Sequence, residues 1–168
     1  TCGFYPVTYA PKGAHLVDMG NPIRDAVRRA MADDYAAPDG ADGPLNLLVF
    51  GGSQGASVFA ALIPAALSAL PVELRDRLRI AQQVREAEMA PISAVYKSAG
   101  VAAELAPFFE DMPRRIAQEH LVISRSGASP VSELTAIGRP SILVPYPSAL
   151  DDHQTANARP LADAGAAV

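Results

Sequence analysis

The chain of 168 residues has little of several features that would assign it to a class at once. Its single cysteine, Cys2, cannot form an internal disulfide, which fits a reducing compartment. Aromatic residues make up only 6% of the sequence. The net charge of −4 has the wrong sign for a protein that mainly binds nucleic-acid phosphates. No apolar run approaches the length of about 18 residues that a transmembrane helix needs.

Several strong sequence signatures are also missing. The sequence contains no C-x-x-C and no H-E-x-x-H, and the absence of G-x-x-x-x-G-K-[ST] excludes a P-loop. An apolar fraction of 49% excludes a disordered chain, and 12 glycines with 15 prolines are too few and too irregular for a fibrous one. The length then favours one globular domain with a full-sized core.

From residue 45 onward, short apolar runs alternate with helical patterns. Strands are expected over residues 45–50, 79–84, 101–105, 121–124 and 141–144, and helices over 56–70, 91–98, 112–119, 130–137 and 152–164. This alternation predicts βαβ units, and hence an α/β fold with a doubly wound, mainly parallel sheet and helices on both faces. In such sheets ligands bind at the carboxyl ends of the strands.

Both ends of the chain have the character of cuts within a longer protein. No Met begins it, residues 1–11 lack the layout of a signal peptide, and the end predicts a helix that stops near Gly165 before a strand just begins. Pro, Gly and Asp dominate residues 33–44, which predicts a loop or linker. We therefore expect a leading segment with a short helix over residues 1–32, this linker, and one domain over 45–168 that is truncated at its C-terminal end.

The first polar turn, Gly51 to Gly55, stands between a predicted strand and a predicted helix. Glycines let the backbone approach a ligand there, and the free N–H groups of the helix start favour an anion. The turn also matches G-x-S-x-G, the nucleophile elbow of α/β-hydrolases, with Ser53 as nucleophile. The remaining members of a triad would be Asp111 with His120, or Asp152 with His153. Too few strands precede the motif for a hydrolase. Contact with phosphate or sugar is therefore favoured over the nucleophile elbow, and it is also favoured over a purely structural turn.

The second polar turn lies in Ser124–Glu133 and repeats the order of strand, glycine turn and helix. Pro130 suits a first helical turn, where its missing N–H would be unpaired anyway. Glu133 lies about one turn further along. Its carboxylate either complements the helix dipole or accepts hydrogen bonds from both hydroxyls of a ribose.

The third polar segment begins with Asp151, Asp152 and His153. A metal site is weakly suggested, yet no further ligand stands at helical spacing, and Asp at a helix start is ordinary capping. Gln154 and Asn157 share one face of the following helix, where two amides suit sugar hydroxyls or form an exposed polar face. Three polar segments at successive strand ends predict one crevice that binds a nucleotide or a phosphosugar.

Taken in order, these segments resemble the C-terminal domain of the MurG family, the UDP-N-acetylglucosamine–N-acetylmuramyl-(pentapeptide) pyrophosphoryl-undecaprenol N-acetylglucosamine transferases. The matching segments are GNPIR (20–24), LLVFGGSQGA (47–56), FFEDM (108–112), SRSGASPVSEL (124–134), GRPSILVPYP (138–147) and DDHQTANA (151–158). The resemblance implies a GT-B glycosyltransferase with two Rossmann-like domains that face each other. This chain would be the C-terminal, donor-binding half.

The resemblance also implies which residues hold the donor, UDP-N-acetylglucosamine (UDP-GlcNAc). Backbone atoms at Phe108 and Phe109 would hold the uracil, Glu133 the ribose hydroxyls, and Gln154 and Asn157 the sugar. The implied donor-binding residues are Arg24, Ser53, Phe109, Arg125, Ala128, Ser129, Glu133, Gln154 and Asn157, with the turn glycines Gly51, Gly52, Gly55 and Gly127. His153 stands where the family has Gln.

The implied activity is an inverting, single-displacement transfer of N-acetylglucosamine to the 4-hydroxyl of lipid I, giving lipid II in peptidoglycan synthesis. The motifs require no metal or cofactor and imply no nucleic-acid partner. Acceptor binding, the general base and membrane contact would belong to an absent N-terminal domain, so this chain alone is expected to be inactive. The parent enzyme would be peripheral, at the cytoplasmic face of the bacterial inner membrane. A related transferase with another lipid acceptor and a non-catalytic nucleotide-binding module remain alternatives.

Overall fold

The computed structural model describes residues 21–147, 149 and 152–168, without the side chains of residues 52–56. The strands are β1 (Leu45–Phe50), β2 (Leu78–Gln83), β3 (Ala102–Ala106), β4 (Leu121–Ser124) and β5 (Ser141–Leu143). The helices are α1 (Asp25–Ala30), α2 (Gly52–Ala69), α3 (Val72–Arg75), α4 (Glu86–Ser98), α5 (Met112–Gln118), α6 (Ala128–Ile137) and α7 (His153–Asp163). The strands form one parallel sheet in the order β3-β2-β1-β4-β5, which confirms the predicted doubly wound α/β fold.

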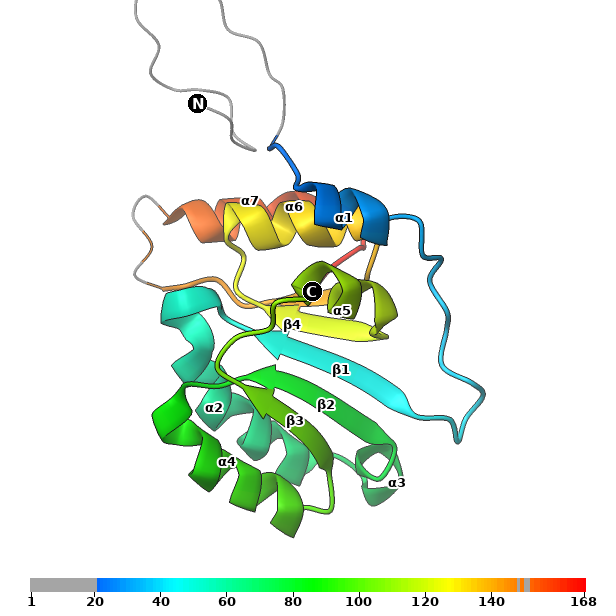
Figure 1. Cartoon of the computed structure of the whole chain (residues 1–168), viewed down its shortest axis with the longest axis vertical. Helices are drawn as coiled ribbons and strands as arrows, with labels where there is room; N and C mark the ends of the chain where they lie inside the picture. The colour runs from blue at the N-terminus through cyan, green and yellow to red at the C-terminus, as the bar shows by residue number, and fades with distance from the viewer. Residues whose placement is uncertain (1–20, 148, 150–151) are drawn as a thin grey trace, which may run out of the picture.

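Separate layers of helices cover the two faces of the sheet (Figure 1). Helices α2 and α4 lie on one face, and α1, α5, α6 and α7 lie on the other. In β1, Leu48 and Phe50 join the apolar cluster beneath the second layer, whereas Leu47 and Val49 join the cluster beneath α2 and α4. A strand that is buried on both faces has an almost continuous apolar sequence, which is why this run was recognisable without alternation.

The strand order reverses between β1 and β4. After β3, at one edge, the chain crosses back over the sheet and continues with β4 on the other side of β1. Phe50 and Ser124, the last residues of β1 and β4, are register partners, so the turns that follow them begin side by side. A reversal of this kind is where doubly wound sheets bind their ligands.

The predicted strands are confirmed, and β1 and β4 have the predicted bounds. Two helices begin earlier than expected: α2 at Gly52 rather than at residue 56, and α4 at Glu86 rather than at Pro91. Most of the first glycine turn is therefore the first turn of α2. Apolar periodicity could not locate these starts, because glycine and charged residues fill them. The four-residue helix α3 was not expected, because it is too short to have a periodic pattern.

Arg139 joins the second helical layer to the 33–44 segment, in which no helix or strand is present. The chain enters this position from Gly138, which ends α6 in the left-handed conformation. The Arg139 side chain is 5% exposed, and its guanidinium donates hydrogen bonds to the carbonyl oxygens of Ala117 at 2.6 and 3.0 Å and of Asp33 at 2.9 Å. Further bonds reach the carbonyls of Ile137, Gly138 and Asp34. The Arg139 side chain thus holds three segments together through their backbone carbonyl groups.

Candidate functional site

Two long helices begin at the same edge of the sheet, directly after β1 and β4. Gly51 precedes α2 and Gly127 precedes α6, and neither helix has a side-chain hydrogen bond that caps its N-terminus. The first N–H groups of a helix have no partner within the helix, and its dipole is positive at this end. The two starts together suit an anion that bridges them. The Ser53 side chain lies outside the described part of the chain, so its role stays a prediction.

The turn after β4 leaves polar groups and open space beside the start of α6. Ser126 is fully buried, and among the described residues its hydroxyl has no hydrogen-bond partner. Gly127 has φ −64°, which any residue adopts, and a Cβ placed there would come no closer than 3.5 Å, to Cδ of Pro130. Ala128 and Ser129 are exposed. The fold itself therefore does not require a glycine at position 127.

Glu133 and Arg24 form an ion pair at this edge. Nη2 of Arg24 donates to Oε1 of Glu133 at 2.7 Å, and the exposed fractions of the two side chains are 65% and 12%. The neighbouring Asn21 amide donates to Oγ of Ser132 at 2.8 Å and to the carbonyl of Ala128 at 3.3 Å. The segment before α1 is thus fixed against the first turns of α6. The structure brings together two of the predicted donor-binding residues.

The amides of α7 hold neighbouring loops in place. Asn157 is 2% exposed, and its Nδ2 donates to the carbonyl of Ser126 at 3.0 Å. Oε1 of Gln154 accepts a hydrogen bond from the backbone N–H of Tyr146 at 3.0 Å. Both residues thus lie at the predicted edge, and Asn157 also fixes the turn that precedes α6. The predicted contacts of these two amides with a sugar remain predictions.

Arg125 is buried below the same turn rather than extended into solvent. Its side chain is 8% exposed, and Nη1 donates to the carbonyls of Val144 at 3.1 Å and Pro145 at 2.7 Å. The guanidinium carbon lies 5.6 Å from the ring centroid of Phe59 and 5.3 Å from that of Tyr146. Burial lowers the pKa of Arg125. These contacts tie β4 to the loop after β5, and a direct contact of Arg125 with a ligand remains a prediction.

Phe108 and Phe109 lie in the loop between β3 and α5 and face opposite environments. Phe108 is 69% exposed, whereas Phe109 is 4% exposed and packs in the same apolar cluster as Phe50, the last residue of β1. This packing holds the loop beside the carboxyl end of β1. The predicted role of its backbone in binding uracil stays a prediction.

The two hydrolase triads considered from the sequence gain no support. Nδ1 of His120 accepts a hydrogen bond from the backbone N–H of Asn46 at 2.9 Å, at the amino end of β1. Ser53 follows the other end of that strand, roughly 20 Å away, so His120 cannot be its base. The Asp152 carboxylate accepts a hydrogen bond from Oγ1 of Thr155 at 2.6 Å, close to the start of α7. Asp151 lies outside the described residues.

The part of the chain that the structure describes contains neither a metal-binding cluster nor a membrane-spanning helix. No group of three or more His, Cys, Asp or Glu side chains in that part of the chain is arranged to hold a metal ion. Within the same residues, no helix combines the length and the hydropathy needed to cross a bilayer.

Residues 46–168 match the glycosyltransferase family 28 C-terminal domain. The chain belongs to this family. The family 28 match starts within β1 and includes both uncapped helix starts, Glu133 and α7, so the edge described above lies wholly within it except for the segment before α1.

Curated relatives extend the similarity to nearly the whole chain. The UDP-N-acetylglucosamine--N-acetylmuramyl-(pentapeptide) pyrophosphoryl-undecaprenol N-acetylglucosamine transferase of Chelativorans sp. (strain BNC1) is 53% identical over 165 residues, which are 98% of this chain and 44% of the relative. The protein of the same name from Methylobacterium sp. (strain 4-46) is 52% identical over 168 residues, which are 98% of this chain and 45% of the relative. The family 28 chain thus spans less than half the length of these relatives.

A solved structure supports the same assignment. The crystal structure of Acinetobacter baumannii MurG superposes with a TM-score of 0.70 at 34% identity, covering 97% of this chain and 44% of that one. The glycotransferase of kitacinnamycin has a TM-score of 0.54 at 20% identity, which supports the fold alone. The predicted Rossmann-like fold of a GT-B enzyme is therefore confirmed for this family 28 domain.

Glu119 has an unusual environment at the opposite end of the sheet. It lines a groove of about 450 Å³ together with Glu104, Arg115 and Arg79. Burial raises the pKa of Glu119 to about 7, with a smaller contribution from the negative charge of Glu104, while the Arg115 guanidinium acts against the shift. Nothing in the sequence distinguished this residue.

Replacing Glu119 by Gln is expected to stabilise the protein at pH 8 but not at pH 4. The folded state of the wild type retains this proton up to about pH 7, whereas an unfolded Glu loses it near its ordinary pKa. Wild-type stability relative to Glu119→Gln should therefore fall as the pH rises from about 4.5 to 7. Urea unfolding of both proteins across this range measures the difference, and Glu73→Gln gives the baseline for removing an exposed carboxylate. A difference that does not change with pH would contradict the assignment.

Proposed function

We propose that the chain is the donor-binding part of a transferase that moves N-acetylglucosamine from UDP-GlcNAc to a lipid-linked acceptor. The observation that carries this proposal is that, in a family 28 domain, groups that suit a nucleoside diphosphate gather at one edge of the sheet. There the carboxylate of Glu133 lies close to the start of α6, and α2 begins after the register-paired end of β1. A nucleoside diphosphate offers a pair of hydroxyls to a carboxylate and two phosphates to helix starts.

Each part of the donor then has a proposed partner. Glu133 takes the ribose hydroxyls, and the backbone of the loop containing Phe109 takes the uracil. The phosphates face the starts of α2 and α6, at Gly51, Gly52, Ser53 and Gly55 and at Gly127, Ala128 and Ser129. Arg24 and Arg125 supply positive charge beside the phosphates, and Gln154 and Asn157 take the sugar hydroxyls.

The names of the relatives support a proposal for the reaction of the parent enzyme. The acceptor is undecaprenyl-pyrophosphoryl-N-acetylmuramyl pentapeptide, whose 4-hydroxyl attacks the anomeric carbon with inversion while UDP leaves. This chain contributes stabilisation of the departing diphosphate by backbone N–H groups, helix dipoles and arginine. The general base, the acceptor contacts and the membrane contact belong to the part of the relatives' length that this chain does not span, and the enzyme works at the cytoplasmic face of the bacterial inner membrane. The chain alone binds donor and does not turn it over.

Calorimetric titration with UDP-GlcNAc, with ADP-glucose as the control ligand, tests the donor assignment. We expect a clear preference for the uridine sugar. Equal binding of the two ligands would leave only a generic phosphate crevice and would contradict the proposal. Transfer of sugar to a lipid I analogue by the isolated chain would contradict the division of labour between this domain and the rest of the enzyme.

Replacing Gly127 by Ala is expected to weaken binding of UDP-GlcNAc without destabilising the fold. The new methyl group meets only Pro130 at ordinary contact distance, so the free energy of unfolding of the variant should stay within about 1 kcal/mol of the wild-type value. The same methyl would stand where the proposed diphosphate approaches the backbone. Calorimetry and thermal unfolding on one preparation separate the two effects, and Gly138→Ala, which strains a residue with φ +73°, is the opposite control. An unchanged affinity of Gly127→Ala for UDP-GlcNAc would contradict the proposed position of the diphosphate at this turn.

A further inference from the structure

The loop from Pro107 to Asp111 must hold a fixed backbone if it recognises a base. It joins β3 to α5 and contains no helix or strand of its own. The start of the loop is fixed by the last residue of β2 and the residue after it. The N–H of Val84 donates to the carbonyl of Ala106 at 2.9 Å, and Nε2 of Gln83 donates to the carbonyl of Pro107 at 3.1 Å. These bonds do not extend to the part of the loop that follows Phe109.

Arg115 holds the part of the loop that follows Phe109 in place. Its Nη1 and Nη2 donate to both carboxylate oxygens of Glu104 on β3, at 2.7 and 2.8 Å. Its Nε donates to Oδ1 of Asp111 at 2.7 Å. The guanidinium carbon lies 4.2 Å from the ring centroid of Phe109. One planar group therefore joins β3, which precedes the loop, to Asp111, the last residue of the loop, and covers the aromatic ring between them.

The geometry distinguishes this cluster from ordinary surface ion pairs. The Arg115 side chain is 21% exposed, against 58% for Glu104 and 46% for Asp111. The hydrogen bond from Arg115 lowers the pKa of Asp111, and the bonds to Glu104 and Asp111 raise the pKa of Arg115. An isolated exposed ion pair contributes little to stability. The Arg115 guanidinium, however, makes two parallel hydrogen bonds to the Glu104 carboxylate and a third to Asp111, and so restricts the positions of both acidic side chains.

We infer that Arg115 is a positioning residue for recognition of the nucleotide base, acting through the backbone of the Pro107–Asp111 loop. The inference rests on the proposed function, which assigns the base to this loop. Arg115 is not among the residues proposed to contact the donor. Its effect is therefore expected on the choice of base and not on contacts with ribose or phosphate.

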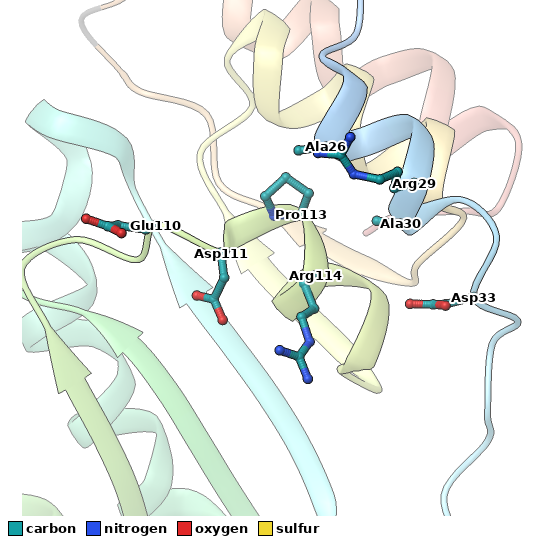
Figure 2. Close-up of a pocket in the computed structure, with 8 residues that line it drawn as sticks. All are labelled: Ala26, Arg29, Ala30, Asp33, Glu110, Asp111, Pro113 and Arg114. Atoms are coloured by element: carbon teal, nitrogen blue, oxygen red, sulfur yellow. The ribbon is translucent and has the colours of Figure 1, made fainter.

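The neighbouring Arg114 provides a matched control. It lies on the same helix, is exposed, and lines with Arg29 a groove of about 340 Å³ between α1 and α5. Figure 2 shows the Asp111 carboxylate and the Arg114 side chain both directed away from α1. Among the described residues the Arg114 side chain has no ion-pair or hydrogen-bond partner, and it acts on Asp111 only through its charge, so its removal changes charge without releasing the loop.

Calorimetric titration of the 168-residue chain with UDP and with ADP, which differ only in the base, tests the inference. Arg115→Ala should weaken UDP binding about tenfold and leave ADP binding unchanged, because it releases charge-assisted bonds that hold only the base-binding loop. Arg115→Lys should recover part of this loss, since an ammonium cannot reproduce the fork. Arg114→Ala should match the wild type. Glu104→Gln, which leaves Arg115 in place, gives a smaller loss in the same direction and serves if Arg115→Ala fails to fold.

The outcomes separate the inference from the proposed function. A wild-type chain without preference for UDP over ADP overturns the proposed function and this inference with it, before any variant is made. A wild type with that preference, whose Arg115→Ala and Glu104→Gln variants retain it, overturns the inference alone. Equal losses for UDP and ADP would show a general effect on the fold and overturn it as well, as would full recovery in Arg115→Lys.

Discussion

Replacing Glu133 by Ala is expected to lower the affinity of the chain for UDP-GlcNAc about a hundredfold. In the proposed complex its carboxylate accepts hydrogen bonds from two ribose hydroxyls, and losing them corresponds to about 3 kcal/mol. The substitution also leaves Arg24 without its partner at 2.7 Å. Calorimetric titration of both proteins with UDP-GlcNAc measures the change.

Two variants control for this result. Glu133→Gln keeps the size of the side chain and one acceptor oxygen, so its affinity should lie between those of the wild type and Glu133→Ala. Glu73→Ala removes an exposed carboxylate on α3, far along the chain from the site, and should bind as the wild type does. Thermal unfolding of each variant shows whether the domain is intact. A folded Glu133→Ala protein with wild-type affinity would eliminate the ribose role of this residue.

Replacing Arg139 by Met is expected to lower the free energy of unfolding by about 3 kcal/mol, because carbonyl groups from three segments, those of Ala117 and Ile137 in buried hydrogen bonds, lose their donor. The Arg139 guanidinium is the donor to Ala117, Ile137, Gly138, Asp33 and Asp34. The thioether keeps much of the length of the side chain but donates no hydrogen bond. For a domain of this size the melting temperature should fall by roughly 6–12 °C.

Arg29→Met provides the comparison for Arg139→Met. Arg29 is exposed on α1, and among the described residues its side chain has no hydrogen-bond or ion-pair partner. Urea unfolding should place this variant within about 0.5 kcal/mol of the wild type. If the two variants lost the same stability, the hydrogen bonds of Arg139 would not be what holds the 33–44 segment to the helical layer.

The strands β1, β4 and β5 were predictable because they are largely buried and apolar residues dominate them. The edge strand β3 is mostly exposed and was predictable only from its place in the alternation of strands and helices. Leu45–Phe50 is the clearest case, since both faces of β1 pack against helices. Helix starts were less predictable, because Gly52 and Glu86 carry no apolar signal. What fixes them is the position of the chain after the preceding strand, which is a property of the sheet and not of the local sequence.

The candidate site was predictable as a set of residues but not as a set of contacts. Glu133 and Arg24 were both named from motifs, yet their ion pair joins positions 109 residues apart, which no spacing rule addresses. Asn157 was considered as a surface amide, whereas it is buried and bonded to the Ser126 carbonyl. Arg139 gave no signal, because a buried arginine whose hydrogen bonds all go to backbone carbonyls has no acidic partner that the sequence could reveal.

The ion pair of Glu133 also bears on how the proposed donor would enter. In the structure this carboxylate already holds a cation from the segment before α1. Binding of a ribose there is an exchange, in which hydroxyl groups replace or share an internal partner, and the measured affinity is the difference between the two arrangements. Added salt screens the exposed guanidinium and so weakens the competitor as well as the attraction for phosphate. The salt dependence of donor binding should accordingly be shallower than the charge of a diphosphate alone would give.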